Sequence, residues 1–141
     1  PQETILFEGS ALCRDTQVDL APGAGCLLLE MIVLGRLAMG ERPTRLHLRD
    51  RRVVRRAGRV IHHDALSLDG DALARLANPA MTAGAPALAT LAIIADDAPD
   101  RLAARFRALR RPVIGHIREG ALILDLRCLD RDEDLLGALS A

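Results

Sequence analysis

The sequence predicts a mainly β protein of the α+β class, in which strands come first and helices come late. Short segments of apolar or alternating residues, each about the length of a strand, recur along the chain. Breaks that contain glycine or proline separate these segments. One later stretch, residues 98–110, instead carries Leu102, Phe106 and Leu109 at helical spacing.

The first half of the chain predicts two hairpins. Residues 4–7 and 11–20 form short segments around Glu8-Gly9-Ser10, which suits a first hairpin. Residues 44–56 and 59–68 flank Ala57-Gly58, a two-residue break typical of a tight second hairpin. Alternation in the last segment places one set of side chains on a common face: Val60, His62, Asp64, Leu66 and Leu68.

The second half predicts a loop, strands and two helices. Asp97 is a good N-cap and Pro99 suits the first turn, so residues 98–110 are expected to form a helix. Acidic residues at 130–134 favour a last short helix over 130–139. The remaining elements expected are a loop at 78–86, a buried strand at 87–95, and strands at 113–117 and 121–128 around Glu119-Gly120.

Composition limits the class of protein. With 141 residues, half of them apolar, the chain is expected to fold as a single domain over residues 1–141. Nineteen basic and nineteen acidic residues cancel, which argues against nucleic-acid binding through bulk charge. The apolar runs are far shorter than the roughly 20 residues that cross a bilayer, so no membrane segment is expected. Three widely spaced cysteines fit the reducing cytoplasm.

The usual motifs of common enzyme classes are absent from the sequence. It contains no P-loop, no dinucleotide-binding glycine pattern and no G-x-S-x-G elbow. The block at residues 45–59 carries seven arginines and one aspartate. Nucleic-acid binding by this block is not expected, because aromatic residues that would stack on bases are missing. The block is therefore either a solvated strand face or a basic patch for an acidic protein partner.

The pair His62-His63, followed by Asp64, raises the question of a metal site. Adjacent residues on a strand point to opposite faces, so His62 and His63 do not chelate one ion together, whereas His62 and Asp64 can. Only two other histidines exist, His47 and His116, and no complete four-ligand site is visible. The alternatives are structural or surface histidines and a transient site that exchanges its ion quickly.

The stretch from Glu30 to Glu41 places carboxylates at both ends of an apolar run, with Gly35-Arg36 between them. A glutamate in apolar sequence is costly to bury unless a cation or hydrogen bonds compensate it. Arg36 is the expected partner, and Gly35 and Gly40 permit turns that bring the three charges together. The stretch is therefore either one ion pair that fixes a loop or a polar lining whose carboxylates attract a divalent cation.

The same region resembles a known family. The features are Pro1-Gln2 with Thr4-Ile5, Gly9, the "LAPGA" string at 20–24, Glu30, Gly35-Arg36, Gly40-Glu41 and the arginine-rich hairpin that ends in Asp64. Together they resemble the urease accessory protein family UreD, also called UreH. The resemblance is strongest over residues 1–68 and is consistent in element order from residue 87 onward. Leu27-Leu28-Leu29 depart from it, since the family tends to carry aromatic residues there, and a late family arginine matches either Asp125 or Arg127.

This resemblance implies a fold and a function. The family's architecture is an irregular β-helix-like stack of sheets with two helices, and its members are about twice as long, so an N-terminal β portion is expected to be missing here. Members are non-enzymatic scaffolds that bind apo-urease and act with UreF and the GTPase UreG, so that nickel reaches the urease active site. A homodimer formed through the accessory complex is also expected.

The expected function is therefore a nickel-delivery scaffold and not an enzyme. Glu30, Arg36, Glu41 and Asp64 are the expected polar path or partner face, with Glu41, His62 and Asp64 as weak metal candidates. No tightly bound cofactor is expected, and nickel is expected only in passing. The alternatives are a β-rich interaction module with no role in metal handling, and a small enzyme that uses Cys13 or a His62–Asp64 pair.

Overall fold

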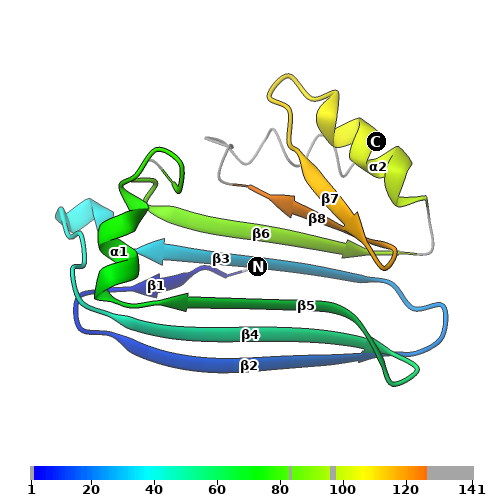
Figure 1. Ribbon diagram of the computed structural model, residues 1–141, viewed down its shortest axis with the longest axis horizontal. Coiled ribbons are helices and arrows are strands. Elements are labelled where there is room, and N and C mark those ends of the chain that lie inside the picture. The colour runs from blue at the N-terminus through cyan, green and yellow to red at the C-terminus, as the bar shows by residue number, and fades with distance from the viewer. Residues whose placement is uncertain (1, 83, 96–97, 127–141) are drawn as a thin grey trace.

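A computed structural model describes residues 2–82, 84–95 and 98–126, and its strands form two stacked sheets (Figure 1). The larger sheet has the order β1-β3-β6-β8-β7 and the smaller sheet the order β2-β4-β5. The strands are β1 (Thr4–Leu6), β2 (Ala11–Leu20), β3 (Cys26–Leu34), β4 (His47–Arg56), β5 (Arg59–Leu68), β6 (Ala87–Ile94), β7 (Gly115–Arg118) and β8 (Ala121–Asp125). The helices are the 3-10 turn η1 (Leu37–Met39), α1 (Gly70–Leu76) and α2 (Pro99–Arg107).

The first four strands alternate between the two sheets. β1 pairs with β3 in parallel, and β2 pairs with β4 in parallel. The predicted hairpin of residues 4–7 and 11–20 is therefore wrong, because the turn at Glu8-Gly9-Ser10 carries the chain from one sheet to the other. The prediction of a mainly β protein is confirmed, whereas the finer description as β-helix-like is not confirmed.

Two hairpins form where the sequence predicts them. β4 and β5 join through Ala57-Gly58, and β7 and β8 join through Glu119-Gly120. The first residue of each turn is not glycine but has a positive φ, 49° at Ala57 and 51° at Glu119. The β4–β5 hairpin also contains a register shift between Val54 and Arg55. Because of this shift, Ile61 rather than Val60 packs between the sheets. The predicted common face of the last arm thus holds only from His62 onward.

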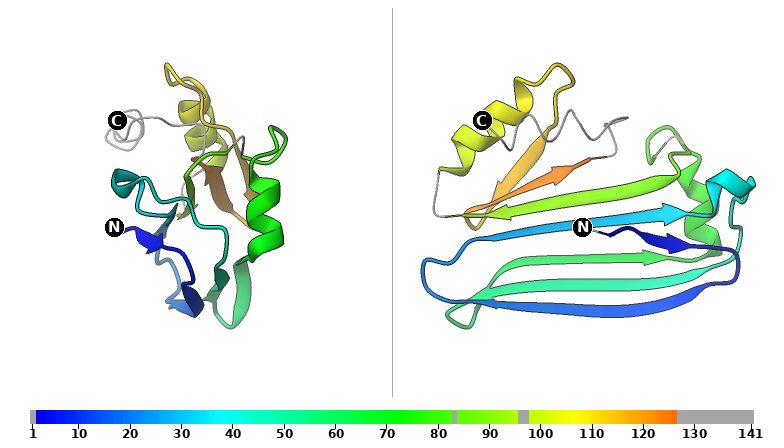
Figure 2. Two further views of the ribbon diagram at one scale, coloured as in Figure 1. Left: turned by 90° about the vertical axis from the view of Figure 1, so that its left-hand side faces the viewer. Right: turned by 180° about the vertical axis from the view of Figure 1, so that it is seen from behind.

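Three apolar clusters stabilise the fold. Two lie between the sheets, one around Ile32, Leu48 and Leu68 and the other around Val54 and Ile94. The third lies on the outer face of the larger sheet, where Phe106 of α2 packs over Leu122 and Leu124 of β8. Figure 2 shows the arrangement in two further views, with the sheets seen edge-on in one of them and α2 beside the larger sheet.

The helices differ in part from prediction. α1 was not predicted and precedes β6, so the order of strands first and helices late is wrong at this point. Asp69 caps α1 by accepting a hydrogen bond from the Ala72 N–H at 2.8 Å, a local signal for its start. α2 is shorter than the predicted 98–110 but has Pro99 at its start. Asp97 and the helix predicted at 130–139 lie outside the described residues.

A charged layer between the sheets as the candidate functional site

A band of charged side chains crosses the space between the two apolar inter-sheet clusters. Along β4, Leu48 and Val54 are buried, and the two alternate residues between them, Asp50 and Arg52, face the same way. Arg14 of β2 lies opposite Asp50 in the strand register, and Asp64 of β5 lies opposite Arg52. Glu30 reaches the band from β3 in the other sheet. We call Arg14, Glu30, Asp50, Arg52 and Asp64 the charged layer.

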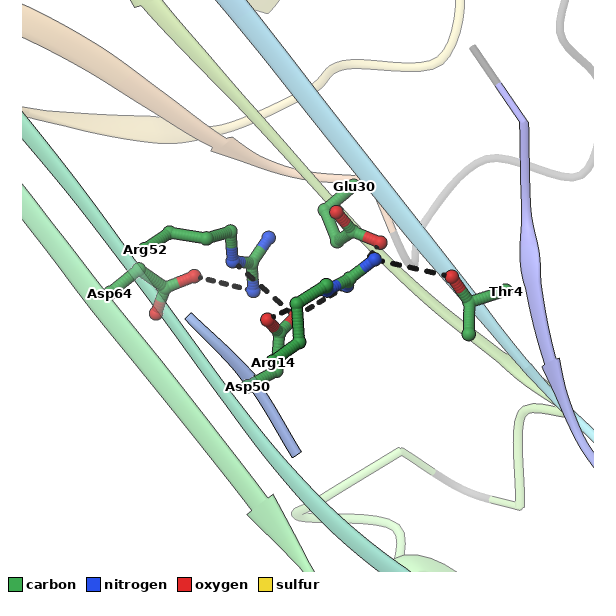
Figure 3. Close-up of polar contacts among 6 residues, drawn as sticks. All are labelled: Thr4, Arg14, Glu30, Asp50, Arg52 and Asp64. Atoms are coloured by element: carbon green, nitrogen blue, oxygen red, sulfur yellow. Dashed lines mark hydrogen bonds and ion pairs between the residues drawn. The ribbon is translucent and has the colours of Figure 1, made fainter. Parts of the chain in front are cut away.

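The five side chains are linked in one chain of ion pairs (Figure 3). Arg14 contacts Glu30 Oε1 at 2.6 Å and donates to both Asp50 oxygens, from Nε at 3.0 Å and from Nη2 at 2.7 Å. Arg52 lies 3.6 Å from Asp50 through Nε and 2.9 Å from Asp64 through Nη2. At the other end, Arg14 Nη1 donates to Thr4 Oγ1 at 3.4 Å. The charged layer therefore connects both sheets.

Burial is greatest in the middle of the charged layer. The Asp50 side chain is 0 % exposed and that of Arg52 5 %, whereas Arg14 and Asp64 are 29 % and 33 % exposed. The hydrogen bonds to Asp50, and then those to Glu30, raise the pKa of Arg14 further above its ordinary value. Two guanidinium groups face three carboxylates, so the layer carries one excess negative charge when all five groups are ionised. Such an excess attracts a cation.

The Asp64 end of the charged layer opens into a groove of about 680 Å³ between β5 and the strands β6, β7 and β8. His62, His63 and His116 line this groove together with Asp64 and Asp125, and we call it the histidine groove. Burial, partly offset by Asp64, lowers the pKa of His62. Its imidazole is therefore neutral at neutral pH and does not neutralise the layer.

The metal candidates are only partly brought together. His62 and Asp64 both line the histidine groove, as the strand alternation predicts. Glu41 instead makes its hydrogen bonds with Arg36 and with the Glu8 backbone. Within the described residues, no group of three or more His, Cys, Asp or Glu side chains has the arrangement that holds a metal ion. The chemistry available to this part of the chain is loose, exchangeable contact through carboxylate and imidazole groups.

The expected meeting of Glu30, Arg36 and Glu41 is wrong for Glu30. Residues up to Leu34 continue as strand β3, so Glu30 points between the sheets and pairs with Arg14. Arg36 and Glu41 do form an ion pair, at 2.5 Å, in the loop that follows the strand. Arg36 first, and then the Glu8 backbone, lower the pKa of Glu41 to about 2.

Three members of the charged layer were not predicted from the sequence. Arg14 lies in a strand expected to form a hairpin, and Asp50 and Arg52 lie in the block interpreted as a solvated face or a basic patch. That interpretation is wrong for Asp50 and Arg52, which are 2 % and 4 % exposed. Strand alternation counted back from Val54 to Leu48 places them between two core positions, but the adjacent buried Val53 interrupts this pattern, so the sequence signal is weak.

Comparison with known proteins identifies the family. A family model described as "UreD urease accessory protein" matches residues 1–137. The chain belongs to the UreD family. Among its relatives, the urease accessory protein UreD of Paracoccus denitrificans is 65% identical over 102 residues, which cover 72% of this chain and 37% of that protein. UreD of Cereibacter sphaeroides is 46% identical over 133 residues, covering 92% of this chain and 48% of the relative.

The chain spans less than half the length of these relatives. The relatives are named as accessory proteins and not as enzymes. Within the described residues, no helix has both the length and the apolar character needed to span a membrane.

Proposed function

We propose that this chain is part of a urease accessory scaffold that assists nickel insertion into apo-urease in the cytoplasm, acting with UreF and the GTPase UreG. Membership of the UreD family supports the accessory role. The observation that carries the role in metal handling is the charged layer, in which three carboxylates share two guanidinium groups inside a sheet sandwich. In this role the chain acts as one domain and binds nickel weakly and transiently.

The mechanism proposed is handover by weak coordination. Nickel enters from the histidine groove, where Asp64 is the most exposed carboxylate of the charged layer, and exchanges among oxygen ligands toward Glu30. Arg14 and Arg52 keep the carboxylates separated and prevent them from closing around one ion. A path of this kind must not hold the metal tightly, because a trapped ion does not reach urease.

Nickel loading tests this role directly. The variants Glu30→Gln and Asp64→Asn are combined with apo-urease, UreF and UreG, and nickel per urease active site is measured together with complex formation. Both variants are expected to reduce loading while the complex still forms. Asp15→Asn is the control, because it removes a carboxylate of an exposed ion pair in the smaller sheet, which also holds Asp64. Glu41→Gln tests whether the loop after β3 contributes to loading independently of the charged layer. Urease is expected to receive nickel normally with this variant.

Two results would contradict parts of the proposal. Normal nickel loading by Glu30→Gln and Asp64→Asn would remove the charged layer from metal handling and leave an interaction module. Failure of the unsubstituted chain to bind apo-urease, UreF or UreG would remove the scaffold role itself.

A further inference from the structure

The ladder between β2 and β4 is long and parallel, and its two strands have no turn in common. It pairs the ten residues of β2 with the ten residues of β4, and all of β3 lies between them in the chain. In the hairpin of β4 and β5, by contrast, a two-residue turn fixes which residues face each other. The register of β2 on β4 must therefore be set by other contacts.

Strand alternation alone does not set this register. A slip by one residue would turn the inner face of β2 outward, but a slip by two residues keeps every side chain on its own face. The side chains of β2 that face the larger sheet are Leu12, Arg14, Thr16, Val18 and Leu20. Three of the five are apolar and fit apolar neighbours in more than one register. Arg14 is different, because its charge needs a partner.

In the native register, Arg14 meets two carboxylates at once, as Figure 3 shows. Its Nε and Nη2 donate to the two oxygens of Asp50, at 3.0 and 2.7 Å, in the forked geometry that suits a guanidinium group. The same Nη2 lies 2.6 Å from Glu30 Oε1. One side chain thus ties β2 to β4 within the smaller sheet and to β3 in the larger sheet.

A slip by two residues in either direction would break these contacts at a buried position. Moved one way, Arg14 would lie opposite Arg52, and moved the other way it would lie opposite the buried Leu48. Each slip would carry Arg14 roughly 7 Å along the strand, away from Glu30. Asp50, whose side chain is fully buried, would lose its forked partner. Breaking a buried ion pair costs far more than breaking an exposed one.

β3 has the same need for a contact that marks its alignment. Every residue of β3 except Glu30 is apolar. Its partner β6 is also apolar except for Thr90, which lies directly opposite Glu30. A slip of β3 on β6 by two residues would mostly exchange apolar neighbours for other apolar neighbours. The contact of Glu30 with Arg14 distinguishes the native alignment from these alternatives.

We propose that the charged layer sets the register of the sheets, with Arg14 selecting the alignment of β2 through Asp50 and the alignment of β3 through Glu30. Buried polar groups fix the register of coiled coils in this way, at a cost in stability. The inference goes beyond the proposed function, because it holds whether or not nickel passes along the layer. It makes Arg14 a positioning residue.

A carboxylate outside the charged layer offers the alternative explanation. Before the start of the ladder, Glu8 accepts from the N–H groups of Thr44 at 2.7 Å and Arg45 at 3.1 Å, so it holds the segment before β2 against the segment before β4. Its side chain is 35 % exposed, so water competes for these hydrogen bonds. Glu8→Ala is therefore the matched comparison.

Disulfide formation by Cys13 of β2 reports the register. Cys13 lies opposite Arg49, on the face of the smaller sheet that points away from the larger sheet. Opposite residues on neighbouring strands are close enough for a disulfide, whereas the next position on the same face, about 8 Å away, is too far. Arg49→Cys thus gives the native crosslink, and His47→Cys and Arg51→Cys give slipped crosslinks. Each crosslink is measured in the full chain by peptide mapping after equilibration with oxidised and reduced glutathione.

Apolar replacement of the pairs is the first test. Without it, the native crosslink is expected to exceed the slipped crosslinks by about a hundredfold. Arg14→Met, Glu30→Met and Asp50→Leu together are expected to raise the slipped crosslinks at least about tenfold, while circular dichroism shows a folded chain. Arg14→Lys keeps the charge and is expected to keep the native crosslink dominant. Glu8→Ala is expected to change the ratio less than about fivefold.

Relocation of the arginine is the second test. Arg14→Thr combined with Thr16→Arg keeps the composition and moves the arginine two residues along β2. In the native register the moved arginine would lie opposite Arg52, whereas a slip by two residues would place it opposite Asp50. The slipped crosslink reported by His47→Cys is therefore expected to exceed the native crosslink.

Three results would overturn the inference. The first is a native crosslink that stays dominant in both sets of Arg14 variants. The second is a shift with Glu8→Ala as large as with the Arg14 variants, which would assign the register to the segment before the ladder. The third is loss of the fold on apolar replacement, because the charged layer would then supply stability and not register.

Discussion

At the scale of single residues, the same pair of strands carries two arginine–aspartate pairs in very different surroundings. Arg14 lies opposite Asp50 on the face between the sheets, and Asp15 lies opposite Arg51 on the outer face. The Asp50 side chain is fully buried, whereas Asp15 and Arg51 are each 47 % exposed. Water and mobile ions screen the outer pair more strongly than the inner one.

Asp50→Asn is therefore expected to lower the free energy of unfolding by about 3 kcal/mol, because it leaves Arg14 and Arg52 facing a neutral amide inside the protein. Chemical denaturation at neutral pH measures the change. Asp15→Asn is the control, with an expected loss below about 1 kcal/mol. Equal losses in the two variants would show that the inner pair gains nothing from its burial.

Acid is expected to weaken the loop after β3, in which Glu41 pairs with Arg36 and accepts from the Glu8 N–H. The pKa of Glu41 is lowered in the folded chain, so its contribution is present above the ordinary carboxyl pKa of 4.5 and is lost as the pH falls toward about 2. The pKa of Glu8 is lowered too, chiefly by the hydrogen bond from the Thr44 N–H, so protonation of Glu8 in acid also destabilises the folded chain. The difference in unfolding free energy between the unsubstituted chain and Glu41→Gln should shrink between pH 5 and pH 2. A constant difference would contradict this linkage.

The sequence identified some site residues and missed others for a physical reason. Glu30 stood out because a carboxylate in apolar sequence needs a partner, and a partner exists. The partner itself, Arg14, was not predictable because it lies in another strand and the sheet assignment of that strand was wrong. Asp50 and Arg52 were hidden in a block whose many arginines resemble a surface.

At the scale of elements, the hairpins were predictable because their signals are local. Ala57-Gly58 and Glu119-Gly120 each mark a tight turn between segments of strand length. The parallel pairs β1–β3 and β2–β4 have no such signal, since their partners are separated by a strand of the other sheet. α1 was missed because its seven residues are too few for a clear helical period.

The turn at Ala57 offers a way to stabilise the protein. Ala57 has φ of 49°, a conformation that alanine disfavours and asparagine tolerates better. Ala57→Asn is expected to raise the free energy of unfolding by about 0.5 to 1 kcal/mol, measured by thermal or chemical denaturation.

Glu119 is the comparison position for this change. It has a similar φ of 51° but also pairs with Arg59 at 2.5 Å. Glu119→Asn should therefore stabilise less than Ala57→Asn, because it relieves the turn and loses the ion pair. A larger gain at Glu119 would contradict the assignment of the effect to backbone conformation.

At the scale of the whole molecule, β8 contributes to two apolar clusters, the one under α2 and the one between the sheets around Val54 and Ile94. Leu122 and Leu124 face α2, whereas Ala121 and Ile123 pack toward the smaller sheet. Loosening of one side therefore disturbs the other, and we expect the described part of the chain to unfold in one transition.

Phe106→Ala tests this coupling. Phe106 is 0 % exposed, and its truncation is expected to cost about 3 to 5 kcal/mol and to lower the midpoint seen by every spectroscopic probe together. Leu109→Ala, at the partly buried edge of the same cluster, should cost less. Separate transitions for probes near α2 and near β2 would show that the two layers are independent.

The parallel pairing of β2 with β4 has a consequence for synthesis. Their register runs from Ala11 opposite His47 to Leu20 opposite Arg56, with all of β3 made in between. On the ribosome, β2 therefore emerges well before any strand that completes its sheet, and such distant pairings close slowly. Until β4 follows, both edges of β2 are open to other chains, whereas in the described part of the chain pairing with β4 covers one of them. We therefore expect the nascent protein to be most prone to aggregation in this interval, and its yield to depend on chaperones that bind extended segments.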